Sequence, residues 1–332
     1  MKIAVIGAGA IGCVAGALLH EKGHAVTLVS RDPRQVRAIN HNGLSIDGIT
    51  GERNYVIYAA RTLEFIPDLA LAAVKTQDME SACRQMKGMG NFPVLTMQNG
   101  LMADEIAGRI LGEDRVISSV VMFGATYKEP GRVTYNFPGG LVIGRAFGRD
   151  GGGVVEKARD ILSAAFEVHV TENIQAVHRA KLILNLNNAV ACILGKDLQE
   201  TFSEDDVCSL GLSLMREAWD VFQAEGSEMA DLPDLPLEKL KSLLCAPKDI
   251  GPKIYGNIMR GLSHLPLPGS VLQSVMRGRD SEVDYLNGEV VREANRAGRE
   301  ARLNRKAVEL VKEIEKTNRY LSVDEMLRRF GL

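Results

Sequence analysis

The stretch Met1-Lys-Ile-Ala-Val-Ile-Gly-Ala-Gly-Ala-Ile-Gly12 decides the fold of this chain. Its four consecutive apolar residues, Ile3 to Ile6, are typical of a strand buried on both faces. Glycines then follow at G-x-G-x-x-G spacing, and the small apolar segment Cys13 to His20 favours a helix packed on a sheet. A second strand is predicted at Ala25 to Val29. Together these segments predict a βαβ unit that binds a dinucleotide.

Each glycine of this loop has a physical reason to be there. Gly7 allows a tight turn out of the strand, Gly9 lets a pyrophosphate approach the backbone, and Gly12 lets the helix pack close to the strand. The N–H groups of the first helical turn favour negative charge at the same place. We therefore expect the cofactor phosphates to bind at Gly7, Gly9, Ala10, Ile11 and Gly12. The alternative is a glycine-rich turn that binds nothing.

The end of the second strand bears on the choice of cofactor. NAD favours an acidic residue there, about 20 residues past the glycines, to bind the ribose hydroxyls. This sequence has Ser30 and Arg31 instead, followed by Asp32, which is expected to open the turn before Pro33. A guanidinium suits the 2′-phosphate of NADP, so NADPH is the expected cofactor. The alternative for Arg31 is an ordinary solvated surface arginine.

Size and composition limit the class of protein. The 332 residues are enough for two domains, and 45% hydrophobic with 25% charged residues is typical of a soluble globular protein. A net charge of −2 gives no indication of nucleic-acid binding. The five cysteines are scattered without a CxxC pair, which indicates neither a disulfide framework nor a metal site and fits a cytoplasmic protein. No apolar run is long enough to predict a membrane span.

Two further buried strands, Leu69 to Val74 and Pro93 to Met97, carry polar residues at their carboxyl ends. Lys75-Thr-Gln77 follows the first strand, and Gln98-Asn99-Gly100 follows the second. Ligands of open parallel sheets gather at the carboxyl ends of strands, so we expect these residues to share a crevice with the glycine loop and Arg31. The alternatives are a solvated loop lysine at Lys75 and simple turn chemistry at Asn99.

The fold class follows from the order of the remaining segments. Helices are predicted at residues 34–42, 78–86 with Asp78 as the cap, 103–111 and 154–166. Strands are predicted at 116–122, 132–136 and 141–144, the later of these antiparallel, and a short strand at 167–171. Two strand-like patches are predicted in 44–58 and a turn at Gly151 to Gly153. We predict an α/β chain: an N-terminal Rossmann-type doubly wound sheet that binds NADP (1–172), followed by an all-helical domain for substrate binding and dimerisation (173–332).

A polar stripe marks the first long helix predicted in the second domain, Gln175 to Leu194. This helix is apolar almost all round and should be buried. Its polar residues His178, Lys181, Asn185 and Asn188 nevertheless fall on one face. A buried lysine is costly unless it is paired or neutral, so the stripe indicates an internal polar cleft. The alternatives are a stripe that faces solvent and, for His178, a structural role.

A second polar group lies about a hundred residues downstream. Ser270 follows a Pro-Gly pair and can cap a helix, and Glu282 and Asp284 are expected to begin a new helix near Ser281. For Ser270 and Glu282, a role at a helix start is the alternative to a role in a binding or catalytic site.

In this order, the residues resemble the ketopantoate reductase (2-dehydropantoate 2-reductase) family over nearly the whole chain. The resemblance rests on the glycine loop, Arg31, Lys75 with Gln77, Gln98-Asn99-Gly100, Lys181-Leu-x-x-Asn185, Ser270, and Ser281-Glu282-Val-Asp284-Tyr-Leu-Asn287-Gly. It implies a Rossmann domain and a helical domain with the active site between them. It also implies an NADPH-dependent reductase of a 2-keto acid, most directly ketopantoate in pantothenate and coenzyme A biosynthesis.

The resemblance also implies residue roles. Arg31 and Lys75 would hold the NADPH phosphates, with Ser30 and Gln77 in the same cofactor site, and Asn99 would lie near the nicotinamide ribose and the substrate. Lys181 would be the general acid, and the keto acid would be held by Asn185, Asn188, Ser270 and Glu282. Glu282 is expected to face the same cleft as Lys181, to keep that lysine protonated and to accept a hydrogen bond from a substrate hydroxyl.

The sequence departs from the family mainly on the substrate side. The second asparagine expected eight positions after the lysine is Ala189 here, and Asn188 is its nearest substitute. Three alternatives therefore stay open: a reductase of a different 2-keto acid, a non-catalytic NADPH-binding regulatory protein, and a dehydrogenase that oxidises a hydroxy acid or sugar acid. A homodimer through the helical domain also stays open beside a monomer.

Overall fold

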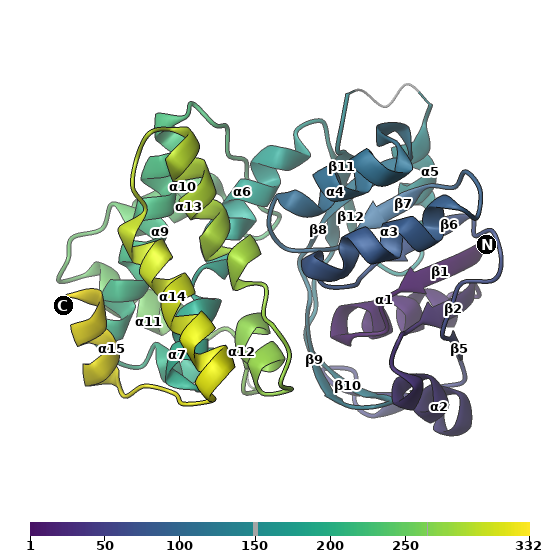
Figure 1. Ribbon diagram of the computed structural model, residues 1–332, viewed down its shortest axis with the longest axis horizontal. Coiled ribbons are helices and arrows are strands. Elements are labelled where there is room, and N and C mark those ends of the chain that lie inside the picture. Colours follow the sequence, from purple (N-terminus) through teal and green to yellow (C-terminus); the bar gives the residue numbers. More distant parts are fainter. Residues whose placement is uncertain (149–151, 264) are drawn as a thin grey trace. The chain divides into compact units, whose positions relative to one another are not determined.

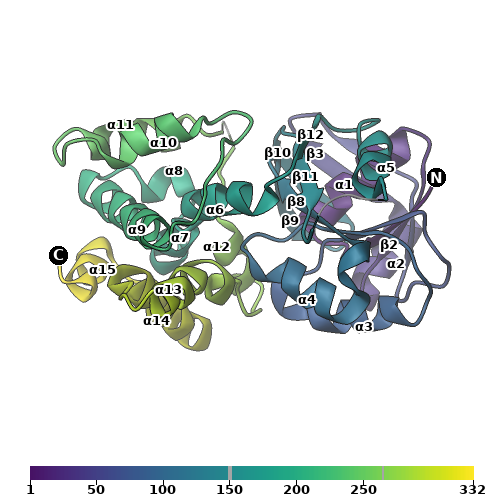
Figure 2. The same cartoon turned by 90° about the horizontal axis from the view of Figure 1, so that it is seen from above.

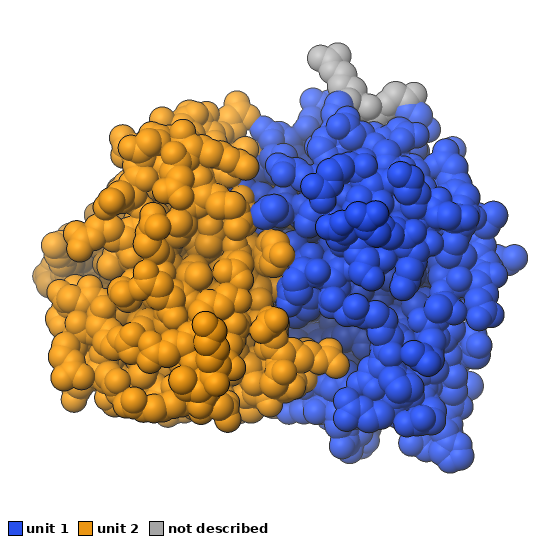
Figure 3. All heavy atoms as spheres, viewed as in Figure 1, with its two compact units in different colours: residues 1–175 blue, residues 176–332 orange. Residues whose placement is uncertain are grey.

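The computed structural model describes residues 1–148, 152–263 and 265–332 and divides the chain into two compact units, Met1–Gln175 and Ala176–Leu332 (Figure 3). The boundary predicted from the sequence was near residue 172. The turn predicted at Gly151 to Gly153 lies partly outside the described residues, because Gly151 is not among them.

The first unit is built on an eight-stranded sheet with the order β12-β11-β8-β7-β6-β1-β2-β5 (Figure 1). Its strands are β1 (Lys2–Ile6), β2 (Ala25–Val29), β5 (Tyr58–Ala60), β6 (Leu69–Ala72), β7 (Val94–Thr96), β8 (Val116–Val121), β11 (Leu141–Arg145) and β12 (Val168–Thr171). All neighbouring pairs are parallel except β8 with β11. The predicted Rossmann-type sheet is confirmed, and β11 is antiparallel to β8 as expected, whereas the last strand, β12, is parallel to β11.

Helices cover both faces of this sheet (Figure 2). They are α1 (Ala10–Glu21), α2 (Pro33–Asn42), α3 (Met79–Lys87), α4 (Met102–Leu111) and α5 (Val154–Leu162), with short 3-10 turns at Thr76–Asp78 (η1) and Glu113–Arg115 (η2). Because side chains alternate along a strand, Ile3 and Val5 pack with α1 and α5 on one face, whereas Ala4 and Ile6 pack with α3 and α4 on the other. The run Ile3 to Ile6 is therefore continuously apolar, as a doubly covered strand requires.

A smaller sheet, ordered β4-β3-β10-β9, joins the core on the α1 face. Its strands are β3 (Leu44–Gly48), β4 (Arg53–Tyr55), β9 (Gly124–Glu129) and β10 (Arg132–Phe137). The two strand-like patches at 44–58 correspond to β3 and β4. Strand β9 was not predicted, since its sequence GATYKE alternates too weakly to indicate one.

The described part of the second unit is helical. Its helices are α6 (Ile174–Asn185, which contains the unit boundary), α7 (Asn188–Leu194), α8 (Leu198–Thr201), α9 (Asp205–Ala224), α10 (Leu237–Leu244), α11 (Gly251–Arg260), α12 (Ser270–Val275), α13 (Asn287–Arg296), α14 (Arg302–Thr317) and α15 (Val323–Phe330), with a 3-10 turn η3 (Val283–Tyr285). Helix α9 packs against α10, α11, α13 and α14, and α7 packs against α12 and α14. Among the described residues, no helix is long and apolar enough to cross a bilayer.

The structure corrects three local predictions. The single helix expected at Gln175 to Leu194 is two helices, α6 and α7, separated by a turn at residues 186–187. Ser270 is the first residue of α12 rather than its cap, which is Gly269. Glu282 and Asp284 do not begin a regular α-helix: Glu282 precedes η3, and the next α-helix begins at Asn287.

Candidate active site

The glycine loop has the shape that a dinucleotide pyrophosphate requires. Gly7 has φ +114° and donates its N–H to the Val29 carbonyl at 2.9 Å. A Cβ on Gly7 would lie 2.5 Å from the Val74 nitrogen, so no side chain fits there. By contrast, a Cβ on Gly9 would meet nothing within 4 Å. The backbone at Gly9 is therefore open to a ligand while the loop around it is tightly packed.

Helix α1 starts directly at this open backbone. Gly9 is its N-cap residue and offers no side chain to cap it, so the first-turn N–H groups at Ala10, Ile11 and Gly12 have no intrahelical acceptor. An anion at this position would accept those hydrogen bonds and meet the positive end of the helix dipole. The five predicted phosphate-binding residues thus fit a pyrophosphate on the geometry of the loop.

Gln35 on α2 supports the glycine loop and was not predicted from the sequence. It is 1% exposed, and its amide nitrogen donates to the Ala8 carbonyl at 2.9 Å. Its amide oxygen accepts from the Gly131 N–H at 2.8 Å and the Tyr127 hydroxyl at 3.1 Å. Gln35 therefore ties the glycine loop to the hairpin between β9 and β10. No local pattern could have shown this, because its partners lie far away in the sequence.

The predicted cofactor residues lie along one edge of the sheet. Strands β2, β1, β6 and β7 are consecutive and parallel, so their carboxyl ends are neighbours. Those ends lead into Ser30 and Arg31, the glycine loop, Lys75 and Asn99, respectively. Gln98, which precedes Asn99, links the ends of β6 and β7. It is 6% exposed and donates to the carbonyls of Ala72 (2.7 Å) and Val74 (2.8 Å). It holds the end of β7 against the end of β6.

Arg31 has an unexpected partner. Its Nη2 lies 2.5 Å from Oδ1 of Asp78, the last residue of η1. Asp78 was predicted to cap the following helix, α3, but its side chain makes no capping hydrogen bond. Asp32, in contrast, was expected to open a turn and caps α2, since its side chain accepts from the Arg34 N–H at 2.9 Å.

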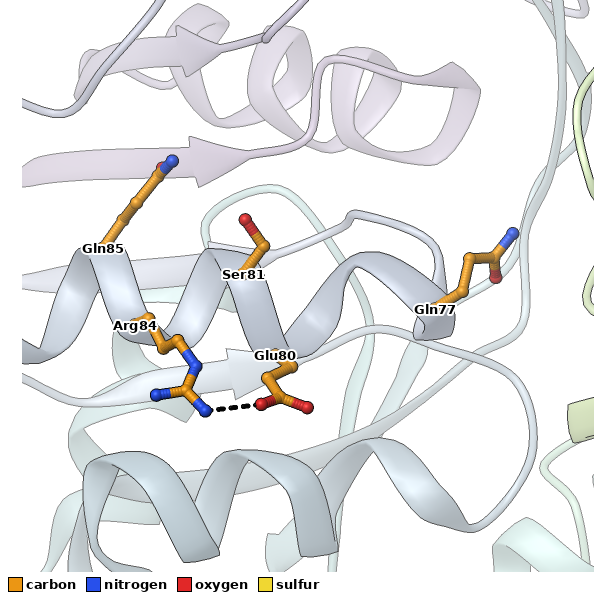
Figure 4. A pocket seen from close by; sticks show the side chains of 5 residues that line it. All are labelled: Gln77, Glu80, Ser81, Arg84 and Gln85. Atoms are coloured by element: carbon orange, nitrogen blue, oxygen red, sulfur yellow. Dashed lines mark hydrogen bonds and ion pairs between the residues drawn. The ribbon is translucent and has the colours of Figure 1, made fainter.

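A shallow surface pocket runs along α3 beside these residues (Figure 4). It is lined by Gln77, Glu80, Ser81, Arg84 and Gln85. Glu80 and Arg84 form an ion pair across one helical turn at 2.6 Å. Of the predicted cofactor residues, only Gln77 lines this pocket.

In the second unit, Lys181 lies in the middle of α6 and is partly buried. Desolvation by the surrounding protein lowers the pKa of its ammonium from 10.5 to about 8. Lys181 makes no hydrogen bond or ion pair with any other described residue. Desolvation is the cause of this shift, and no carboxylate of the described residues counteracts it. A lysine in this state is poised to give up its proton near neutral pH.

The asparagine stripe is split by the turn between α6 and α7, and Asn188 has a positioning role. Its Oδ1 accepts the Ser270 N–H at 3.2 Å, and its Nδ2 donates to the Asn185 carbonyl at 2.9 Å. The structure thus brings Asn185, Asn188 and Ser270 together. Ser270 Oγ is buried without a hydrogen-bond partner among the described residues. Buried hydroxyls are rarely left unpaired, so this one is suited to a ligand.

The turn between α6 and α7 is stabilised by the motif that contains Glu282. Asn287 is fully buried, and its Nδ2 donates to the Leu186 carbonyl at 3.3 Å and to Asn304 Oδ1 at 2.9 Å. Asn304 in turn donates to Glu217 at 2.8 Å. Glu282 is 4% exposed, so its carboxylate does not face bulk solvent. His178 is also buried, at 5% exposed. Among the described residues, no group of three or more His, Cys, Asp and Glu side chains could hold a metal ion.

Sequence comparisons match both units. The model of the family described as ketopantoate reductase PanE/ApbA matches residues 3–147, and the corresponding C-terminal model matches residues 173–315. A 2-dehydropantoate 2-reductase of Pyrococcus abyssi is 30% identical over 310 residues, which cover 92% of this chain and 94% of the relative. The enzyme of that name from Pyrococcus horikoshii is 30% identical over 307 residues, with the same coverage.

Structural comparisons agree with the sequence comparisons. A PanE/ApbA family ketopantoate reductase from Ralstonia eutropha superposes with a TM-score of 0.78 at 27% identity, covering 96% of this chain and 99% of the other. A D-mandelate dehydrogenase solved with NADH and anilino(oxo)acetate gives a TM-score of 0.81 with the same coverage, but at 20% identity this likeness shows the fold alone. The two family models and the full-length relatives cover the glycine loop and the lysine helix in one chain, which therefore belongs to the ketopantoate reductase family.

Proposed function

We propose that this protein reduces a 2-keto acid to the 2-hydroxy acid with NADPH, and that its substrate is 2-dehydropantoate, on the route to pantothenate and coenzyme A. The observation that carries the proposal is Lys181, which has no partner among the described residues and has a pKa of about 8 on a buried helix of a ketopantoate reductase family member. A lysine that only stabilised the fold would gain from a partner carboxylate.

Reducing a ketone needs a hydride at carbon and a proton at oxygen. The nicotinamide cofactor supplies the hydride when bound. Lys181 Nζ supplies the proton, and its positive charge stabilises the alkoxide that develops. Its lowered pKa serves this task, because an acid is most effective when its pKa is near the working pH.

The cofactor side of the proposal rests on the open backbone at Gly9 and on Arg31. The glycine loop and the start of α1 would hold the pyrophosphate, and Arg31 with Lys75 would hold the 2′-phosphate. Ser30, Gln77 and Asn99 follow strand ends at the same edge of the sheet and would contact the rest of the cofactor.

On the substrate side, Ser270 would donate its unpaired hydroxyl to the substrate carboxylate, together with Asn185. Glu282 would accept a hydrogen bond from the substrate hydroxyl, because a carboxylate beside the acid group would repel it. Asn188 is held by Ser270 and Asn185, so it does not simply replace the asparagine that the family has at Ala189. That difference favours a second candidate, reduction of a 2-keto acid other than 2-dehydropantoate.

The experiment is to follow NADPH and NADH consumption by the purified protein with 2-dehydropantoate, trimethylpyruvate, pyruvate and phenylpyruvate. Trimethylpyruvate is 2-dehydropantoate without its hydroxyl and is the matched control substrate. The highest kcat/KM for 2-dehydropantoate supports the proposal. A higher value for another 2-keto acid selects the second candidate. Dinucleotide binding without turnover on any of them would indicate a non-catalytic, regulatory protein.

A further inference from the structure

The ion pair between Arg31 and Asp78 spans the glycine loop. Arg31 follows β2 and Asp78 follows β6, and the sheet order places β1 between those two strands. The loop that leaves β1 therefore lies between the elements that the pair connects. Arg31 is the residue expected to bind a 2′-phosphate, and in this structure a carboxylate holds it instead.

The Asp78 side chain is not tied to the helix that it precedes. It makes no capping hydrogen bond to α3, and its side chain is 35% exposed, while that of Arg31 is 62% exposed. Exposed ion pairs contribute little to stability because solvent screens them and ordering the side chains costs entropy. The pair can therefore open at small cost when a stronger anion reaches Arg31.

We propose that Asp78 sets the preference between phosphorylated and unphosphorylated dinucleotides by competing for Arg31. A 2′-phosphate must displace the Asp78 carboxylate and then lie near its negative charge. A cofactor without that phosphate leaves the pair intact, and the carboxylate can accept a hydrogen bond from a ribose hydroxyl. Asp78 therefore narrows the preference for NADPH that Arg31 creates. This inference rests on the dinucleotide-binding part of the proposed function.

The test measures dissociation constants for NADPH and NADH by nucleotide fluorescence, without any substrate. Asp78→Asn removes the competing charge at constant size. It should tighten NADPH binding about fivefold, the upper range for an exposed ion pair, and leave NADH unchanged or slightly weaker. The gain should shrink at high salt, because screening weakens the competition. Asp78→Ser should give the same direction, so the result does not depend on one variant folding.

Glu80 offers a matched control on the same helix. It also lies in the first turn of α3, but it pairs with Arg84 (Figure 4). Its second partner is Arg109, and it forms no ion pair with Arg31. Glu80→Gln removes an equal charge. It should leave unchanged the ratio of the NADH dissociation constant to the NADPH dissociation constant, which Asp78→Asn should raise. Arg31→Ala should weaken NADPH binding selectively, and adding Asp78→Asn to it should change the ratio much less than it does in the presence of Arg31.

The inference is overturned if both Asp78 variants leave the ratio unchanged or lower it, or if Glu80→Gln raises it equally. It is also overturned if Asp78→Asn raises the ratio as much without Arg31. These outcomes are distinct from failure of the proposed function. A wild-type protein that binds neither dinucleotide overturns both, whereas one that binds both with an unchanged ratio in the variants overturns only the role of Asp78.

Discussion

Asn188 Oδ1 accepts a hydrogen bond from the backbone N–H of Ser270 at 3.2 Å and so joins the start of α7 to the start of α12. The contact is close enough that a Cβ on the neighbouring Gly269 would lie 2.5 Å from the same Oδ1 atom. The position of the unpaired Ser270 hydroxyl therefore depends on Asn188.

Asn188→Ala should raise the KM for the keto acid about five- to tenfold, the loss expected for one hydrogen bond that positions a ligand, with a smaller change in kcat. Gly269→Ala should reproduce the defect by pushing Asn188 away. Gly261→Ala is the control, since a Cβ there meets only ordinary contacts at 3.6 Å. Steady-state kinetics measure KM and kcat for each variant. An unchanged KM in Asn188→Ala would show that Ser270, as positioned by Asn188, does not bind the substrate.

Lys181 gives a prediction about pH. Its pKa falls from 10.5 to about 8 because burial disfavours the charged form. Only the ammonium can donate a proton, so kcat/KM for reduction should be level below pH 8 and fall about tenfold per pH unit above it.

Lys181→Ala should lower kcat by about 10²-fold or more and remove this alkaline limb, while NADPH binding is retained. The control is Lys196→Ala, which removes an exposed lysine that pairs with Glu200. Retained turnover in a folded Lys181 variant would place the proton donor elsewhere, with the buried His178 as the next candidate.

The sequence was most informative where structure is local. The apolar run Ile3 to Ile6, the glycine loop and the strand ends at Arg31, Lys75 and Asn99 are each determined by nearby residues, and the first unit has these elements where they were expected. The lowered pKa of Lys181 also agrees with the argument that a lysine on an apolar helix is desolvated.

Interactions between distant segments could not be predicted. The apolar pattern of residues 175–194 is compatible with one helix. At the break after Asn185, however, the Leu186 carbonyl accepts from Asn287, about a hundred residues later in the sequence. The pairing of Arg31 with Asp78 likewise requires knowledge of the strand order. Side-chain hydrogen bonds of this kind leave no periodic signal in a sequence.

Asn287 therefore gives a prediction about stability. Asn287→Ala leaves the buried Asn304 Oδ1 without the donor from Asn287 and removes one of two donors to the Leu186 carbonyl, which also accepts from the Ala189 N–H at 3.2 Å. This loss should cost about 2 kcal/mol and lower the unfolding midpoint by roughly 5 °C. Asn295→Ala is the matched control, because Asn295 is exposed on the same helix, α13. Thermal unfolding followed by circular dichroism measures both variants. Equal midpoints would show that the turn between α6 and α7 is stable without Asn287.

Glu282 gives the last prediction, which concerns substrate recognition. Its side chain is 4% exposed, so the carboxylate is shielded from bulk solvent. We expect this buried carboxylate to accept a hydrogen bond from the hydroxyl that 2-dehydropantoate has and trimethylpyruvate lacks. Glu282→Gln keeps the size and one acceptor oxygen but removes the charge. It should lower kcat/KM for 2-dehydropantoate by about tenfold or more, because hydrogen bonds to charged groups are the stronger ones. The kcat/KM for trimethylpyruvate should change much less.

The matched control for Glu282 is Asp284→Asn, which removes a carboxylate two residues away that pairs with Lys312 on α14. This variant should affect both substrates equally and little. Equal losses on the two substrates in Glu282→Gln would instead assign Glu282 to the stability of the loop before η3. Because a site that binds a hydroxyl leaves its own buried polar group unpaired when the hydroxyl is missing, the wild type should also reject trimethylpyruvate. Glu282→Gln should narrow that discrimination.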